Sequence, residues 1–258
     1  MFFNERKKEY VSAGGPVRYL DGSSLARPFD LPKRTIAALC AFVLVAAVIG
    51  GVFLYNFLDT VLNASAREQA SVEQNLARDV SYDLPQLSAL MAADDDAIRQ
   101  TFADAGLTIY DKTNPEENPN GGLDLVKLPS DVTEVDAALL YAQGVSNLSA
   151  ADAAKLLKGS WTFTVSRNDY VDMRVKYADF SSGSVEAAIQ AAMASEGLEG
   201  STLGESGVDD AGNTFQTGTI DVDGTTYAWR VSAIALSSVY DITGLPDTAV
   251  YVGVRMTP

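Results

Sequence analysis

The chain has 258 residues and a formal net charge of −15, from 19 Lys and Arg against 34 Asp and Glu, and it contains one Cys and no His. This composition excludes histidine-based catalysis and a disulfide-bonded scaffold, and it excludes general attraction to polyanions such as nucleic acids. The composition does not identify an activity.

The charge divides at one long apolar run, residues 35–58. Seven bases and four acids precede this run (+3), whereas 12 bases and 30 acids follow it (−18). Because the basic flank of a membrane segment stays on the cytoplasmic side, the asymmetry predicts a cytoplasmic N-terminus and an extracytoplasmic C-terminal region. On so acidic a region, docking to anionic wall polymers or lipid headgroups requires a local basic patch or bridging cations.

The run itself reads TIAALCAFVLVAAVIGGVFLYNFL, without a charged side chain. At about 1.5 Å per residue, a helix of this length crosses a hydrocarbon core of about 30 Å, which predicts a transmembrane helix with the lipid bilayer as its partner. Cleavage after Ala66 is the alternative, because Ala64-Ser65-Ala66 has the form of a signal-peptidase site. The long N-region and apolar run favour an uncleaved signal anchor, since signal peptides have apolar cores of about 7–15 residues.

Small residues lie four apart within the run, Ala46 with Gly50 and Ala47 with Gly51. This spacing lets two membrane helices approach closely and predicts a weak homodimer, but the same spacing is also common by chance in membrane helices. The preceding residues, 1–34, lack apolar periodicity and are too short to bury a core. We therefore expect them to form a flexible cytoplasmic tail.

A juxtamembrane or stalk helix is expected over residues 59–93, up to the start of the folded domain. Residues 59–82 are rich in Ala, Glu, Gln and Arg and lack Gly and Pro, and Val72, Leu76 and Val80 share one helical face. A heptad repeat fails over this segment, which favours a stalk packed on its own domain over a long coiled coil. Pro85 interrupts the pattern.

Residues 94–258 carry the signals of an extracytoplasmic domain with several helices. Asp94-Asp95-Asp96 opens a helix that ends before Gly106, and a further helix is expected over 184–196. Thr133 with Asp136, and Ser149 with Asp152, have the spacing of capped helix starts. Residues 112–122 are expected to form a loop.

Strand signals dominate the second half of this domain. Trp161–Ser166 and Val171–Tyr177 alternate apolar with polar residues, and Asp223-Gly224 is placed for a type I′ hairpin between two further strands. Residues 250–256 form a last alternating strand. The predicted fold class is α+β: a single N-terminal transmembrane helix, a stalk helix, and an extracytoplasmic domain whose antiparallel sheet is covered by helices on one side.

No catalytic, cofactor-binding or metal-binding residue is predicted, and no cofactor. The extracytoplasmic region has neither His nor Cys, no Ser lies three residues before a Lys, and Val208 replaces the second Gly of a nucleophile elbow at residues 204–208. No phosphate-binding glycine loop and no complete calcium loop occurs. Enzymatic activity is therefore uncertain and disfavoured.

Three functions remain open. The first is a non-catalytic, membrane-anchored interaction or accessory factor in bacterial envelope assembly, division or polymer export, with an envelope or membrane protein as partner. The second is a sensory ligand-binding domain working with a partner membrane protein, because the anchor, the stalk and the segment DAGLTIYD at 104–111 broadly resemble Cache or PAS-like extracellular sensors. The third is a carboxylate-based wall hydrolase, for which two suitably spaced acids suffice.

Overall fold

The computed structural model describes residues 33–116 and 120–258, so the predicted tail lies almost wholly outside the described residues. The chain divides into two compact units between Val61 and Leu62. This division falls within the long helix α1 (Lys33–Leu76), and each unit is described by itself below.

Within the first unit, α1 exposes its apolar side chains from Phe42 to Leu58. Among the described residues, α1 is the one helix long and apolar enough to cross a membrane, which fits a transmembrane or signal anchor. Gly50 and Gly51 have open space where a side chain would project. Homodimerisation through the small residues of this helix stays a prediction.

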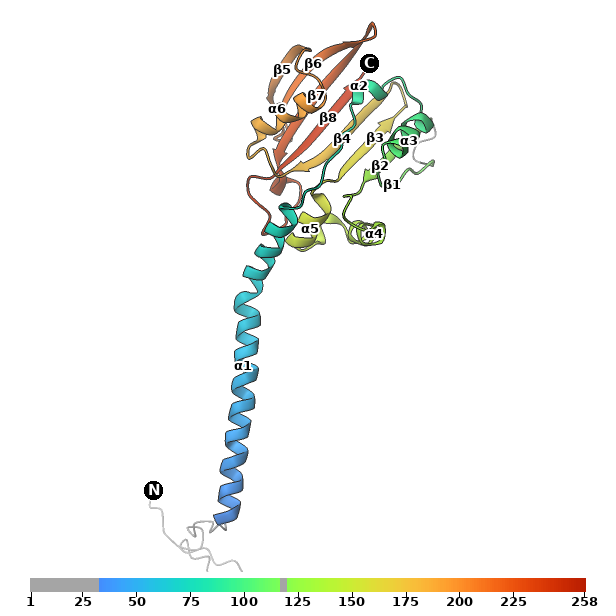
Figure 1. The fold of residues 1–258 in the computed structure, drawn as a ribbon. Helices are drawn as coiled ribbons and strands as arrows, with labels where there is room; N and C mark the ends of the chain where they lie inside the picture. Colours follow the sequence, from blue (N-terminus) through green and yellow to red (C-terminus); the bar gives the residue numbers. More distant parts are fainter. Residues whose placement is uncertain (1–32, 117–119) are drawn as a thin grey trace, which may run out of the picture. The chain divides into compact units, whose positions relative to one another are not determined.

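The second unit contains one eight-stranded antiparallel sheet with the strand order β1-β2-β3-β4-β8-β7-β6-β5 (Figure 1). Its strands are β1 (Ile109–Asp111), β2 (Gly122–Lys127), β3 (Trp161–Ser166), β4 (Asp172–Asp179), β5 (Thr202–Val208), β6 (Thr214–Val222), β7 (Thr225–Ala235) and β8 (Val250–Thr257). The β3–β4 hairpin is confirmed, and so is the β6–β7 hairpin, where Asp223 and Gly224 have φ of 54° and 79° as a type I′ turn requires. Strands β1, β2 and β5 were not predicted.

The α-helices described in this unit are α2 (Leu87–Leu90), α3 (Asp95–Asp104), α4 (Glu134–Gln143), α5 (Ala150–Leu157) and α6 (Val185–Ser195), with 3₁₀ turns at Val145–Asn147 and Leu236–Ser238. Four of these five α-helices, α3 to α6, begin where the sequence predicts a helix start, whereas the short α2 was not predicted and has no capping side chain. The Asp94 carboxylate accepts a hydrogen bond from the backbone N–H of Ala97 at 2.8 Å. Thr133, Ser149 and Ser184 cap α4, α5 and α6 in the same way.

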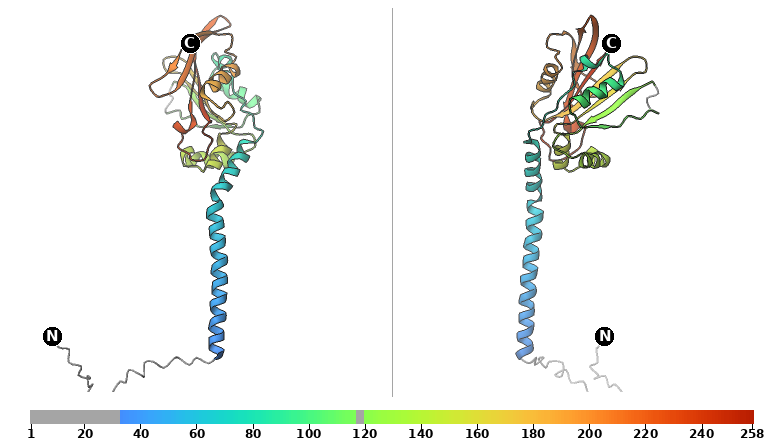
Figure 2. Two further views of the ribbon diagram at one scale, coloured as in Figure 1. Left: turned by 90° about the vertical axis from the view of Figure 1, so that its left-hand side faces the viewer. Right: turned by 45° about the vertical axis from the view of Figure 1, so that its right-hand side comes forward.

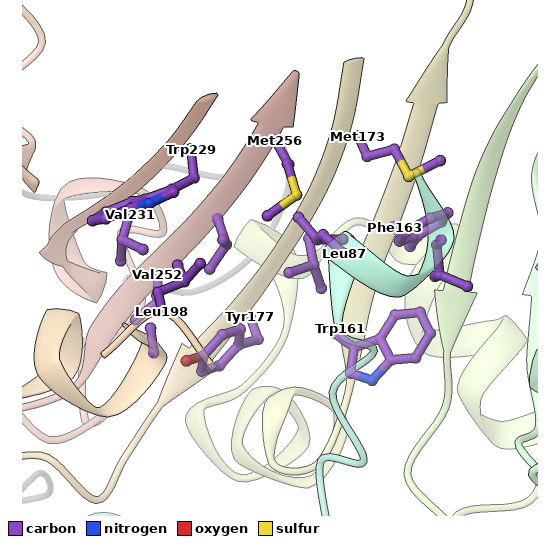
Figure 3. Close-up of a cluster of buried hydrophobic side chains, with 14 of the residues drawn as sticks. Leu87, Trp161, Phe163, Met173, Tyr177, Leu198, Trp229, Val231, Val252 and Met256 are labelled. Carbon is purple, nitrogen blue, oxygen red and sulfur yellow. The ribbon is translucent and has the colours of Figure 1, made fainter. Parts of the chain in front are cut away.

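The main hydrophobic core lies between the sheet and helices α2, α3 and α6, of which α3 and α6 can be followed on the same side of the sheet in Figure 2. Side chains that alternate along the central strands supply the sheet half of this core. Figure 3 shows Trp161, Phe163, Val252 and Met256 directed toward Leu87 of α2, and all five side chains are at most 1% exposed. Burial of these large apolar groups holds the helices on this face.

The sequence predicted helices on one side of the sheet only. This expectation was wrong, because α4 and α5 cover one end of the opposite face as well. Val126, Ala178 and Tyr251 point to this face, and they pack in a second apolar cluster with Leu156 and other residues of α4 and α5. The short, Ala-rich α5 packs closely there, and Ala153 of this cluster has no exposed surface. The rest of this face, called the open face below, carries no helix.

The end of α1 that belongs to the second unit packs against α5. Val72 is 3% exposed and lies in an apolar cluster with Ala150 and Ala154. The Asn75 side chain donates to the carbonyl of Ala151 at 2.7 Å, and the Glu68 carboxylate accepts from the Ala151 N–H at 2.9 Å. Helix α1 ends at Leu76, so the segment 59–93 expected to form a stalk helix is continuous helix only up to this residue, and the chain then continues without helix to α2.

Glu196, at the end of α6, is the most deeply buried carboxyl group among the described residues. It is 2% exposed, and its Oε2 accepts a hydrogen bond from the Leu87 N–H at 2.9 Å. Burial raises the pKa of Glu196 to about 7, with the Leu87 hydrogen bond opposing the rise. The folded protein therefore binds a proton at this site over a pH range in which the unfolded chain has released it.

We expect the free energy of unfolding to fall as the pH rises from about 4.5 to about 7, because the unfolded chain gains stability by ionising Glu196 over this range. The contribution amounts to about 3 kcal/mol at most. Urea titrations followed by tryptophan fluorescence should show this slope, and Glu196→Gln should remove it. An identical pH dependence in both proteins would contradict the assignment.

Candidate functional site

The open face carries three arginines side by side on the central strands β4, β8 and β7. The register pairs Arg174 of β4 with Arg255 of β8, and Arg255 with Arg230 of β7. Each arginine follows or precedes a buried residue of the main core, so strand alternation directs it to the face that the helices leave open. We call Arg174, Arg255 and Arg230 the arginine row. Neighbouring strands lie about 4.8 Å apart, so the row spans about 10 Å.

Like charges directly opposite one another destabilise a sheet, and two carboxylates counter this repulsion. Both oxygens of Asp172 accept hydrogen bonds from Arg174, at 3.0 and 2.6 Å, and from Arg255, at 3.0 and 2.8 Å. Asp209, in the β5–β6 turn, accepts from Arg230 at 2.6 Å. The Arg230 guanidinium also lies 4.1 Å from the centre of the Phe215 ring.

These contacts keep both carboxylates ionised. Burial raises the pKa of Asp172, but the hydrogen bonds and charges of Arg174 and Arg255 outweigh burial and hold this pKa below its ordinary value. The backbone N–H of Asn213 is the largest cause that lowers the pKa of Asp209, and Arg230 adds to it. The Asp172 hydrogen bonds in turn raise the pKa of Arg255.

Two hollows open along the arginine row. The small hollow, about 230 Å³, lies over Gly253, where β8 presents no side chain between Lys176 and Ser232. All three arginines of the row, Lys176 and Asp209 line it. The large hollow, about 540 Å³, adjoins it at Arg230 and Arg255, and the further side chains that line it include Tyr170, Glu205, Thr217, Thr219 and Thr257.

Two other hollows among the described residues of the second unit lack such a convergence of charged donors. A groove of about 620 Å³ between the end of α1 and residues 243–247 has the acids Glu68, Glu73 and Asp247 in its lining. A hollow of about 260 Å³ beside α3 is largely apolar, and its two charged residues, Arg99 and Asp111, pair with each other at 3.0 Å. The arginine row with its two hollows is therefore the candidate site.

Sequence reasoning named no site residue and did not find the arginine row. The local signal was present, because Arg174 alternates with Met173 and Val175 in a predicted strand, and Arg255 lies between Val254 and Met256. What was missing is the pairing of β8 with the preceding strand β7 and, above all, with β4, which is far from β8 in the chain.

The glycine segment examined as a nucleophile elbow lies in the edge strand β5 rather than in a strand-to-helix turn. Of its residues, Gly204 and Glu205 line the large hollow. The calcium-loop fragment at Asp221–Gly224 is the tight turn of the β6–β7 hairpin, and the Asp221 carboxylate accepts from the Gly224 N–H at 3.1 Å. The first segment is thus part of a strand, and the second is the turn of a hairpin.

No protein-family model matches the chain, and neither a curated protein nor a solved structure is significantly similar to it. The function is therefore argued from the site itself.

Asp172 is expected to neutralise the arginine row, and Asp172→Asn tests this. At low ionic strength the variant should lose about 1–2 kcal/mol of unfolding free energy, because two facing guanidinium groups no longer share a carboxylate. High salt should reduce the loss by screening. The double variant Asp172→Asn/Arg174→Thr should recover stability in urea titrations. A loss that neither salt nor the second substitution relieves would count against this role.

Proposed function

We propose that the protein is a non-catalytic, membrane-anchored interaction factor of the bacterial envelope, serving envelope assembly, division or polymer export. In this proposal α1 crosses the membrane with its N-terminus in the cytoplasm, and the extracytoplasmic domain binds its envelope partner at the arginine row. The observation that carries the proposal is the row itself. Three adjacent arginines on an uncovered face, in a region with 30 acids after the apolar run (residues 59–258), are the local basic patch that anionic partners require.

The two carboxylates that pair with the arginine row support binding rather than hydrolysis. A carboxylate hydrolase needs one acid with a raised pKa to protonate the leaving group. Asp172 and Asp209 have lowered pKa values and are held by arginines. Glu196 has a raised pKa, but it is buried against the N–H of Leu87 and lines neither hollow. The third function is therefore the weakest of those considered.

The sensory alternative is favoured by one observation, the apolar hollow beside α3. Phe102, Leu107 and Leu125 line it together with the Arg99–Asp111 pair. Its volume of about 260 Å³ is small against the roughly 300–1,000 Å³ of typical small-molecule pockets. The arginine row offers more converging donors, so we place the function there.

The proposed topology predicts that a thiol at the tip of the β6–β7 hairpin reacts from outside the cell. In a Cys40→Ser background, Asp223→Cys should be labelled in intact cells by a membrane-impermeant maleimide. Ser12→Cys should be labelled only after permeabilisation. The purified protein should have the mass of a chain that retains residues before Arg67. Labelling of Ser12→Cys alone in intact cells, or an N-terminus at Arg67, would contradict the anchored topology.

The proposed interaction face predicts site-specific photo-crosslinking in living cells. A photoreactive amino acid at Thr219, which lines the large hollow and is exposed, should give a discrete higher-mass product. The same amino acid at the exposed Glu186 of α6 should not. Adding Arg230→Gln and Arg255→Gln should abolish the product from Thr219. Equal products from both positions, or a product unaffected by the two substitutions, would refute the assigned face.

A further inference from the structure

The small hollow carries a surplus of two positive charges. Its four cations are the three arginines of the row and Lys176, which forms no ion pair with any described residue. The carboxylates that pair with these cations are Asp172 and Asp209. A phosphate monoester carries a charge of about −1.5 to −2 at neutral pH, which matches this surplus, whereas a carboxylate neutralises half of it.

The arrangement of the donors also favours a phosphoryl group. Asp172 occupies the Nε and Nη2 atoms of both Arg174 and Arg255, which leaves Nη1 of each without a hydrogen-bond partner among the described residues. A planar carboxylate is satisfied by one guanidinium fork. A tetrahedral phosphoryl group has three terminal oxygens, and these can accept from guanidinium groups on three neighbouring strands.

Gly253 provides the space for such a group. A Cβ atom placed there would come within 3.4 Å of the Ser232 hydroxyl and 3.8 Å of Cγ of Lys176. Any side chain at this position would therefore extend into the small hollow between the cations. The Ser232 hydroxyl lies at the edge of this hollow, where it donates a hydrogen bond to the Gly253 carbonyl at 3.4 Å and keeps its oxygen as an acceptor.

The large hollow has a different chemistry. Hydroxyl groups of Tyr170, Thr217, Thr219 and Thr257 line it, and beyond Arg230 and Arg255 it has no further cation. Glu205 lines it as well and disfavours a second phosphate group there. A neutral body rich in hydroxyl groups fits this lining, because it can exchange hydrogen bonds with the threonines and pack on the exposed Tyr170 ring.

We propose that the open face binds a phosphorylated saccharide of the envelope. Its phosphate monoester lies over Gly253 among the three arginines and Lys176, and its sugar ring lies in the large hollow. This inference rests on the proposed function and names the chemistry of the partner. Both hollows meet at Arg230 and Arg255, so one ligand with a phosphate attached to a sugar reaches both.

Isothermal titration calorimetry of the full chain in detergent micelles tests the inference, with glucose 6-phosphate as the probe. We expect a Kd below about 1 mM. Inorganic phosphate and glycerol 3-phosphate should bind at least about tenfold more weakly, because each lacks the sugar ring, and glucose alone should give no measurable heat. Glycerol 3-phosphate stands for lipid headgroups, so equal binding of it would overturn the assignment to a saccharide.

Two variants locate the site. Arg255→Gln should weaken glucose 6-phosphate binding at least about tenfold by removing charge-assisted hydrogen bonds. Gly253→Val should weaken it by a similar factor while keeping every charge, because the side chain fills the small hollow. Arg99→Gln is the matched control, since Arg99 on α3 has the same side-chain exposure as Arg255, 40%, and it should change Kd less than about twofold.

Unchanged binding in both Arg255→Gln and Gly253→Val would overturn the proposal, as would equal affinity for inorganic phosphate and glucose 6-phosphate. Circular dichroism confirms that each variant is folded. Absence of glucose 6-phosphate binding, together with crosslinking at Thr219 that still depends on the arginines, would reject the phosphorylated saccharide and leave the proposed interaction face intact. Absence of both would reject the face itself.

Discussion

Electrostatic repulsion among three neighbouring guanidinium groups is the constraint around which the open face is organised. The position of the arginines is set by strand alternation. A strand that buries Met173, Trp229 or Met256 in the main core must direct its adjacent arginine to the open face. The face then needs carboxylates, and Asp172 and Asp209 supply them. With Lys176, the face carries four cations, and two carboxylates do not neutralise them. The face therefore keeps a positive surplus within a strongly acidic domain.

The alternation of side chains along the central strands places the stabilising core on one face of the sheet and the candidate binding site on the other. One face of the central strands is closed by α2, α3 and α6 over a core of aromatic and aliphatic side chains, and this core provides most of the stabilisation. The opposite face is anchored only at the end covered by α4 and α5. The middle of the open face therefore holds charged side chains and a glycine outside the main core, and such a face is suited to contact with another molecule.

The sequence predicted the parts of the structure that depend on neighbouring residues. Asp94, Thr133 and Ser149 cap helices as expected, and Asp223-Gly224 forms the expected hairpin turn. Strands β1, β2 and β5 were missed because β1 has three residues, β2 is buried almost throughout and β5 is exposed almost throughout, so none alternates clearly. The arginine row was missed because each strand shows a single arginine, and only long-range pairing brings the three together.

The central claim is that the arginine row is occupied by a partner in the cell. Modification with phenylglyoxal, followed by mass spectrometry, measures this directly when intact cells are compared with purified protein. Arg99 is the internal reference, because its side chain is 40% exposed against 45%, 40% and 35% for Arg174, Arg255 and Arg230. We predict that the row reacts in purified protein and is protected in cells, while Arg99 reacts equally in both. Equal reactivity of the row in both settings would contradict the account.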